Sequence, residues 1–139
     1  MRRIEIPGRP ALELAHLLLD VNGTLTNRGE LIDDVEAKLR RLRETLAVHL
    51  VSADTSRTVV DGAEKAALVR ELCPRHCVAI GNGANDAGML QQAVLGIVVI
   101  GREGAAAATV AAADVVCHSI GDALELLLDD RALAATLRP

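Results

Sequence analysis

The sequence contains no phenylalanine, tyrosine or tryptophan among its 139 residues. Proteins that bind exposed bases stack them on such side chains, and a net charge of −4 provides no basic face for a phosphate backbone. We therefore expect no nucleic-acid partner. No apolar run approaches the roughly 20 residues of a membrane helix, and the first ten residues lack the apolar core of a signal peptide. These absences predict no membrane partner and a cytoplasmic location.

Cysteine is also scarce, with only Cys73, Cys77 and Cys117. An odd number of cysteines in a chain expected to be intracellular argues against a disulfide framework. The segment CPRHC at residues 73–77 resembles half of a zinc site, but a zinc ion needs four ligands and the other candidates are distant in sequence. We interpret this segment as the end of a helix that runs into a loop.

What the sequence does contain is typical of one globular domain. Half of the residues are apolar and about a quarter are charged, and a chain of this length can bury a single core. We predict one domain that covers residues 1–139.

Short, nearly continuous apolar runs alternate with segments of helical spacing. Such runs are typical of strands buried on both faces, which belong to parallel sheets. Alternation of strand and helix predicts an α/β fold, a three-layer, Rossmann-like parallel sheet flanked by helices. The first residues alternate apolar and polar side chains around a Pro-Gly turn and predict an N-terminal β-hairpin. The predicted strands of the parallel sheet are residues 16–21, 47–53, 77–80, 96–100 and 114–117.

The helical segments carry start signals. Asp33 and Glu36 resemble a capping box before a helix with apolar residues at helical spacing, and a second helix is predicted to begin near Asp61. The Ala-rich residues 101–114 predict a helix that packs closely on the sheet, and residues 121–137 predict one or two amphipathic helices.

Ligands of such folds bind beyond the carboxyl ends of the strands. Small, polar loops follow the first, second and third of these runs, with the sequences DVNGT, SADTS and GNGAND, and the first and third of these loops contain glycine. Backbone N–H groups in loops of this kind can hold an anion. Asp20 at the end of the first run is a candidate nucleophile or metal ligand, or simply the cap of a turn.

Three further residues complete this candidate site. The hydroxyl of Ser52 could grip a phosphoryl oxygen, and Lys65 lies in the first turn of a predicted helix, where its ammonium could face the same anion. Asp86 could chelate Mg²⁺ together with Asp20. The structural alternatives are a solvated lysine and an aspartate that caps the helix that follows it.

Taken in order, DVNGTLT, a strand followed by Ser52, a helix with Lys65 and the stretch GNGANDAGML resemble the haloacid dehalogenase (HAD) superfamily of phosphotransferases. The resemblance covers about residues 15 to 129. It implies that Asp20 is the phosphorylated nucleophile, with Ser52 and Lys65 as catalytic phosphoryl ligands. It also implies phosphate contacts from Asn22, Gly23, Thr24, Ser52, Ala53, Lys65 and Asn85, and a Mg²⁺ ion held by Asp20, the main-chain carbonyl of Asn22, Asn82 and Asp86.

The stretch around Asp20 is similar to the phosphorylation stretch of P-type ATPases, D-K-T-G-T-L-T. No membrane or nucleotide-binding segment accompanies it here, so the chain resembles small P-type-ATPase-like members that lack a cap domain. This implies a Mg²⁺-dependent phosphohydrolase or phosphotransferase that acts on a small phosphorylated molecule or another activated phosphoryl donor. A homo-oligomer or a partner protein could supply the substrate selection that a cap otherwise gives.

The sequence departs from the family pattern at three places. Asn22 replaces an aspartate that protonates the leaving group, and general acid–base help is typically worth ~10² to 10⁴-fold. Asn82 replaces a magnesium aspartate, and about a dozen residues separate Ser52 from Lys65, where the family fits a helix and a strand. We therefore expect slow turnover and a sheet that lacks one strand or has a distorted edge. In such a sheet the side chain of Lys65 could miss the site.

These departures keep other functions open. One alternative is a phosphate-sensing or protein-interaction module that keeps the fold with little catalysis. A receiver-like domain also uses an aspartate, a hydroxyl and a lysine around Mg²⁺, but the acidic pair that a receiver has near its first strand is absent from the first 19 residues.

Overall fold

The computed structural model of the chain describes residues 1–20, 26–27, 30–31, 34–51 and 62–139. Asp33, Asp61 and the short segment after Ser52 lie outside the described residues. Within these ranges, the order of strands and helices follows the alternation that the sequence predicts.

The centre of the fold is a parallel sheet, and within the described residues it has five strands in the order β6-β3-β7-β8-β9. These elements confirm the predicted Rossmann-like sheet, and β6 is its outermost strand on one side. Continuous apolar runs form it because both faces are covered. The strands are β3 (His16–Asp20), β6 (Ala47–Val51), β7 (Cys77–Gly81), β8 (Leu95–Val99) and β9 (Val115–Cys117).

The predicted hairpin is also present. Strands β1 (Arg2–Ile6) and β2 (Arg9–Leu14) pair antiparallel, and the turn between them places Gly8 at a φ of 86°, a conformation that favours glycine. A second small antiparallel pair, β4 (Thr26–Asn27) with β5 (Glu30–Leu31), follows β3.

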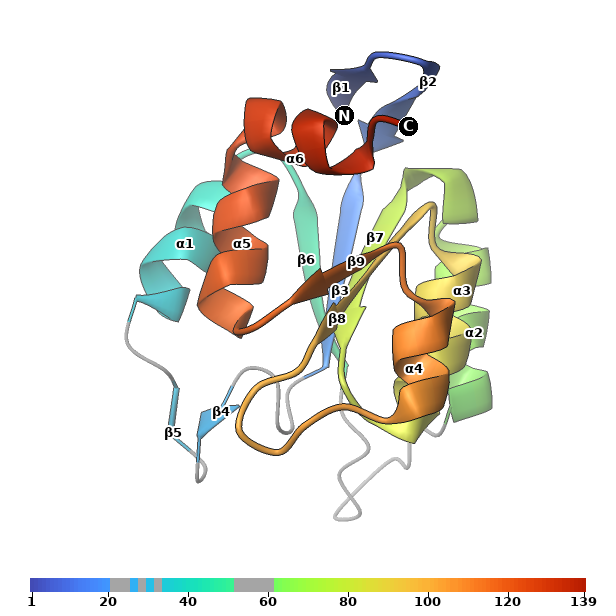
Figure 1. Cartoon of the computed structure of the whole chain (residues 1–139), viewed down its shortest axis with the longest axis vertical. Helices are drawn as coiled ribbons and strands as arrows, with labels where there is room; N and C mark the ends of the chain where they lie inside the picture. Colours follow the sequence, from blue (N-terminus) through green and yellow to red (C-terminus); the bar gives the residue numbers. More distant parts are fainter. Residues whose placement is uncertain (21–25, 28–29, 32–33, 52–61) are drawn as a thin grey trace.

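Helices cover both faces of the sheet (Figure 1). On one face lie α1 and α5, and on the other lie α2, α3 and α4, which makes three layers. None of the described helices is both long and apolar enough to cross a membrane. The helices are α1 (Val35–Leu42), α2 (Gly62–Glu71), α3 (Ala87–Gln92), α4 (Ala107–Ala112), α5 (Ile120–Leu128) and α6 (Asp130–Leu137).

Alternation along β3 divides the core in two. Leu17 and Leu19 pack in the cluster that contains α1 and α5, whereas Leu18 packs in the cluster that contains α2 and α3. Successive side chains of a strand point to opposite faces, so this short run stabilises both layers at once. The next residue on the Leu18 face is Asp20, which ends the strand.

Two local predictions are refined. The first helix begins at Val35 with Asp34 as its N-cap, so the predicted capping box that starts at Asp33 is wrong by one residue. Asp34 has a φ of 79° and makes no side-chain cap bond; its carboxylate pairs with Lys38 instead. The C-terminal segment forms two helices because Asp129 ends α5 and caps α6 through the N–H groups of Arg131 and Ala132.

A histidine pair joins β3 to the edge strand β6. His16 Nδ1 lies 3.1 Å from His49 Nε2, a distance at which one neutral ring can donate to the other. Burial lowers the pKa of His49 from its ordinary value of 6.5, and the nearby His16 adds to the effect. Below pH 6.5 the unfolded chain therefore binds more protons at His49 than the folded protein does.

From this linkage we predict that the free energy of unfolding falls as the pH drops from 6.5 through the lowered pKa of His49. His49→Gln, which cannot titrate, should flatten this pH dependence in urea unfolding between pH 5 and 8. His118→Gln, at an exposed position, should keep the wild-type slope. A wild-type slope in His49→Gln would contradict the assignment.

Candidate functional site

Two of the predicted site residues lie at the carboxyl edge of neighbouring strands. Asp20 is the last residue of β3, and Leu19 pairs with Ile80 of β7, so Asn82, directly after β7, lies just beyond the level of Asp20. Both are buried, with exposed fractions of 4% for Asp20 and 7% for Asn82. Rigid strand ends therefore hold a carboxylate and an amide together at the edge where such folds bind ligands.

Lys65 joins them from the first turn of α2. Its side chain is fully buried, and its Nζ lies 2.8 Å from Asp86 Oδ1 and 3.6 Å from Asp20 Oδ1. A buried ammonium is costly unless it is paired, and here it is shared by two carboxylates. The short connection after Ser52 therefore does not keep Lys65 away from Asp20.

Asp86 closes the turn that follows β7. Its Oδ2 accepts hydrogen bonds from the N–H groups of Asn82 and Gly83, both at 3.1 Å, while Oδ1 faces Lys65. Both oxygens of this fully buried carboxylate are therefore engaged. Gly81 is required beside it, because an added Cβ would lie 2.5 Å from Asp86 Oδ2.

The other predicted residues divide into two groups. Asn85 is exposed in the same turn, in the short 3-10 helix Ala84–Asp86. The remaining predicted phosphate and nucleophile-loop residues lie outside the described residues, although Val51, which precedes Ser52, pairs with Asp20 across the sheet. The residues in this second group are Asn22, Gly23, Thr24, Ser52 and Ala53.

Sequence reasoning missed Thr109. This residue of α4 is fully buried, and its hydroxyl donates to the carbonyl of Gly83 at 2.6 Å. The available signal was compositional, because Thr109 is the one hydroxyl residue in the Ala-rich stretch 101–114. A polar side chain on a helix that packs closely on a sheet needs a partner.

The cysteine and histidine segment has structural roles. Cys77 is buried and its thiol lies 3.2 Å from the carbonyl of Cys73, while His76 Nδ1 lies 2.8 Å from the carbonyl of Glu13. Burial raises the pKa of Cys77 to about 11, opposite to the change that a zinc thiolate requires. In the described part of the chain no three His, Cys, Asp or Glu side chains gather as a metal cluster.

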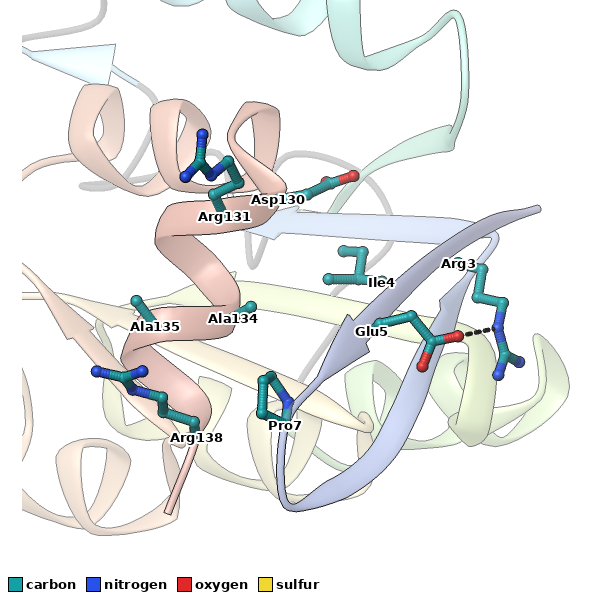
Figure 2. Close-up of a pocket in the computed structure, with 9 residues that line it drawn as sticks. All are labelled: Arg3, Ile4, Glu5, Pro7, Asp130, Arg131, Ala134, Ala135 and Arg138. Carbon is teal, nitrogen blue, oxygen red and sulfur yellow. Dashed lines mark hydrogen bonds and ion pairs between the residues drawn. The ribbon is translucent and has the colours of Figure 1, made fainter.

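A separate pocket of about 420 Å³ lies between β1 and α6 (Figure 2). It is next to the hairpin, which precedes β3, whereas Asp20 ends β3 at the opposite edge of the sheet. It contains none of the predicted site residues. Its lining residues are Arg3, Ile4, Glu5, Pro7, Asp130, Arg131, Ala134, Ala135 and Arg138.

Comparison of sequences places the chain beside one protein of unknown activity. No family model matches the chain. The uncharacterized protein MJ0073 of Methanocaldococcus jannaschii is 48% identical over 71 residues, which are 51% of this chain and 76% of that protein. The chain belongs to the same family as that protein.

Solved structures with the same arrangement share little sequence with this chain. The 3-deoxy-D-manno-octulosonate 8-phosphate phosphatase of Moraxella catarrhalis aligns with a TM-score of 0.64 and 18% identity, over 90% of this chain and 94% of its own. A putative HAD superfamily hydrolase of Legionella pneumophila aligns with a TM-score of 0.61 and 16% identity, over 89% and 87%. This chain has the HAD fold.

An ATPase domain also aligns with this chain. The catalytic domain of the CPx-ATPase CopB-B gives a TM-score of 0.59 at 19% identity, over 71% of this chain and 46% of that one. At these identities the likeness establishes the fold, and the resemblance stated from the motifs is confirmed at that level.

The buried lysine gives a direct stability prediction. Lys65→Met keeps the apolar stem but leaves Asp20 and Asp86 buried without the ammonium, so we expect a loss of about 3 to 5 kcal/mol in the free energy of unfolding. The matched control is Lys38→Met, because Lys38 is itself largely buried but pairs with exposed carboxylates; it should lose about 1 kcal/mol or less. Equal losses in urea unfolding would contradict the prediction.

Proposed function

We propose that this protein is a Mg²⁺-dependent phosphohydrolase or phosphotransferase that forms an aspartyl phosphate at Asp20. The observation that supports the proposal best is the buried contact of Lys65 with both Asp20 and Asp86 at the carboxyl edge of the sheet. A charged trio that is costly to bury and sits where the fold binds ligands is expected of a functional site. The site is contained in one domain, residues 1–139.

The donor chemistry of the described residues fits a magnesium ion. Mg²⁺ prefers oxygen ligands, and Asp20 and Asn82 offer a carboxylate and an amide from adjacent strand ends. We assign these two side chains to direct contact with the ion, together with the main-chain carbonyl of Asn22. The sequence predicted Asp86 as a further ligand of the ion. Because both of its oxygens already accept hydrogen bonds, we propose instead that Asp86 holds Lys65 and the turn. When bound, the ion neutralises charge on the phosphoryl oxygens.

The proposed chemistry begins with attack of a carboxylate oxygen of Asp20 on phosphorus. The bond from phosphorus to the donor oxygen breaks, and the leaving group departs with the electron pair. Lys65 and Ser52 hold the transferred phosphoryl oxygens, with the loop residues Gly23, Thr24 and Ala53 and the side chain of Asn85 around them. Water then cleaves the aspartyl phosphate, which releases inorganic phosphate and restores Asp20.

The amide at residue 22 limits the donors. The amide of Asn22 is too weak an acid to protonate a leaving oxygen and too weak a base to activate water. Donors with good leaving groups, such as acyl and aryl phosphates or a nucleoside triphosphate, need the least protonation. The phosphatase from Moraxella catarrhalis is described as a complex with magnesium, phosphate and a sugar acid, which supports a small phosphorylated molecule as substrate class. We also propose that the protein is cytoplasmic and that an oligomer or a partner protein supplies its substrate selection.

The covalent step is tested by intact mass after incubation with acetyl phosphate, an aryl phosphate or ATP. We predict that the wild type gains one phosphoryl group only when Mg²⁺ is present, and that Asp20→Asn gains none. Asp34→Asn, an exposed acid at the start of α1, should label like the wild type. Labelling of Asp20→Asn, or no labelling of the wild type by any donor, would refute the mechanism.

A phosphate-sensing or protein-interaction module is the second candidate, and the two amides Asn22 and Asn82 favour it. Such a module would bind beryllofluoride tightly with Mg²⁺, as a mimic of the phosphorylated aspartate, yet show no release of phosphate. Tight binding without turnover would therefore select the module over the enzyme.

The amide at residue 22 also gives a gain-of-function prediction. Asn22→Asp restores the missing acid and base, so the aspartyl phosphate should hydrolyse about 10² to 10⁴-fold faster, measured as loss of the added mass after the donor is removed. Asn82→Asp is the matched amide-to-acid change and should tighten Mg²⁺ binding without this acceleration. Unchanged hydrolysis in Asn22→Asp would remove Asn22 from the mechanism.

A further inference from the structure

The turn between β7 and α3 is held from two sides. On the inner side, Asp86 Oδ2 accepts the N–H groups of Asn82 and Gly83. On the outer side, the segment at the start of α4 contacts the carbonyls of the same two residues. The N–H of Ala106 donates to Asn82 O at 2.9 Å, and the hydroxyl of Thr109 donates to Gly83 O at 2.6 Å.

The hydroxyl of Thr109 bonds to a residue outside its own helix, which is not its usual partner. A threonine hydroxyl in a helix commonly donates to the carbonyl one turn earlier in the same helix, as Thr136 does to Ala132 in α6 at 2.9 Å. The hydroxyl of Thr109 instead crosses to another element, 26 residues away in sequence. Since Thr109 is fully buried, loss of this partner would leave a buried polar group unsatisfied.

We propose that Thr109 is a positioning residue for the magnesium side of the site. Its partner, the carbonyl of Gly83, also accepts the N–H of Asp86 at 2.9 Å, so Thr109 fixes the acceptor that holds the backbone of Asp86 in the turn. The same turn carries Asn82, the proposed ion ligand, and Asp86 in turn holds Lys65. Thr109 touches neither donor nor ion and acts through this turn, so the inference rests on the proposed function.

Removal of the Thr109 hydroxyl should weaken the binding of Mg²⁺. Partners that orient metal ligands typically contribute 10 to 100-fold in affinity when they are lost. We expect Thr109→Val, which keeps the side-chain shape, to raise the dissociation constant for Mg²⁺ by about 10-fold. The measurement is a calorimetric titration with Mg²⁺ alone. Thr109→Ser keeps the hydroxyl that bonds to Gly83, so its dissociation constant for Mg²⁺ should stay within about 2-fold of the wild-type value.

Two further measurements separate positioning from simple packing. Amide hydrogen exchange should quicken at residues 82–86 in Thr109→Val and remain unchanged in the hairpin. Thr136→Val removes a threonine hydroxyl bond far from the site and should leave both exchange at residues 82–86 and Mg²⁺ affinity at wild-type values. If Thr109→Val does not fold, Thr109→Ala replaces it in the same comparison with Thr109→Ser.

The outcomes are distinct. Weaker Mg²⁺ binding in Thr109→Val, with rescue by Thr109→Ser, supports the inference. Wild-type affinity in a folded Thr109→Val, or faster exchange at residues 82–86 without any change in affinity, overturns it. A wild type that binds Mg²⁺ but accepts no phosphoryl group overturns the proposed enzyme, and the titrations of the variants still decide the role of Thr109.

Discussion

The arrangement of this protein depends on one buried ammonium. Lys65 lies between two carboxylates that come from different elements, Asp20 at the end of β3 and Asp86 after β7. A charge without access to water must be paired, so α2 can dock only where both acids meet it. Apolar packing stabilises the two faces of the sheet. The contact of Lys65 with the two acids fixes the first turn of α2 at the carboxyl edge of the sheet, the edge at which folds of this kind bind ligands.

The same contact explains why the short connection after β6 is tolerated. Within the described residues the sheet ends at β6, as the spacing between Ser52 and Lys65 led us to expect, and α2 begins at Gly62. Parallel strands carry helices on their faces. Lys65 reaches Asp20 because α2 covers the face toward which Leu18 and Asp20 point, and this placement needs no further strand at the edge.

The sequence predicted the strands and helices, and it placed the candidate site at the carboxyl edge of the sheet, because both follow from local patterns. Runs such as residues 16–21 are too apolar to be exposed on either face, and the polar residue that ends each run must come at its carboxyl edge. The contact of Thr109 with Gly83 could not be predicted in this way. Its partner Gly83 is set by how α4 packs on the turn, a long-range contact that no spacing within the Ala-rich stretch encodes. The helix start predicted at Asp33 was wrong for a local reason, because Asp33 and Asp34 are residues of the same type and local pattern does not distinguish them as N-caps.

The charge of the site follows from which acids have been replaced by amides. The HAD pattern places aspartates at the positions of Asn22 and Asn82, so the stretches DVNGT and GNGAND keep two acids, Asp20 and Asp86, where the pattern has four. Fewer acids attract Mg²⁺ less strongly, but they also repel an incoming phosphoryl dianion less. Asp86 is engaged by Lys65 and two N–H groups, and Asp20 is the acid that we propose as the nucleophile. In the chemistry that we propose, a site with fewer acids therefore favours acceptance of a phosphoryl group over its release.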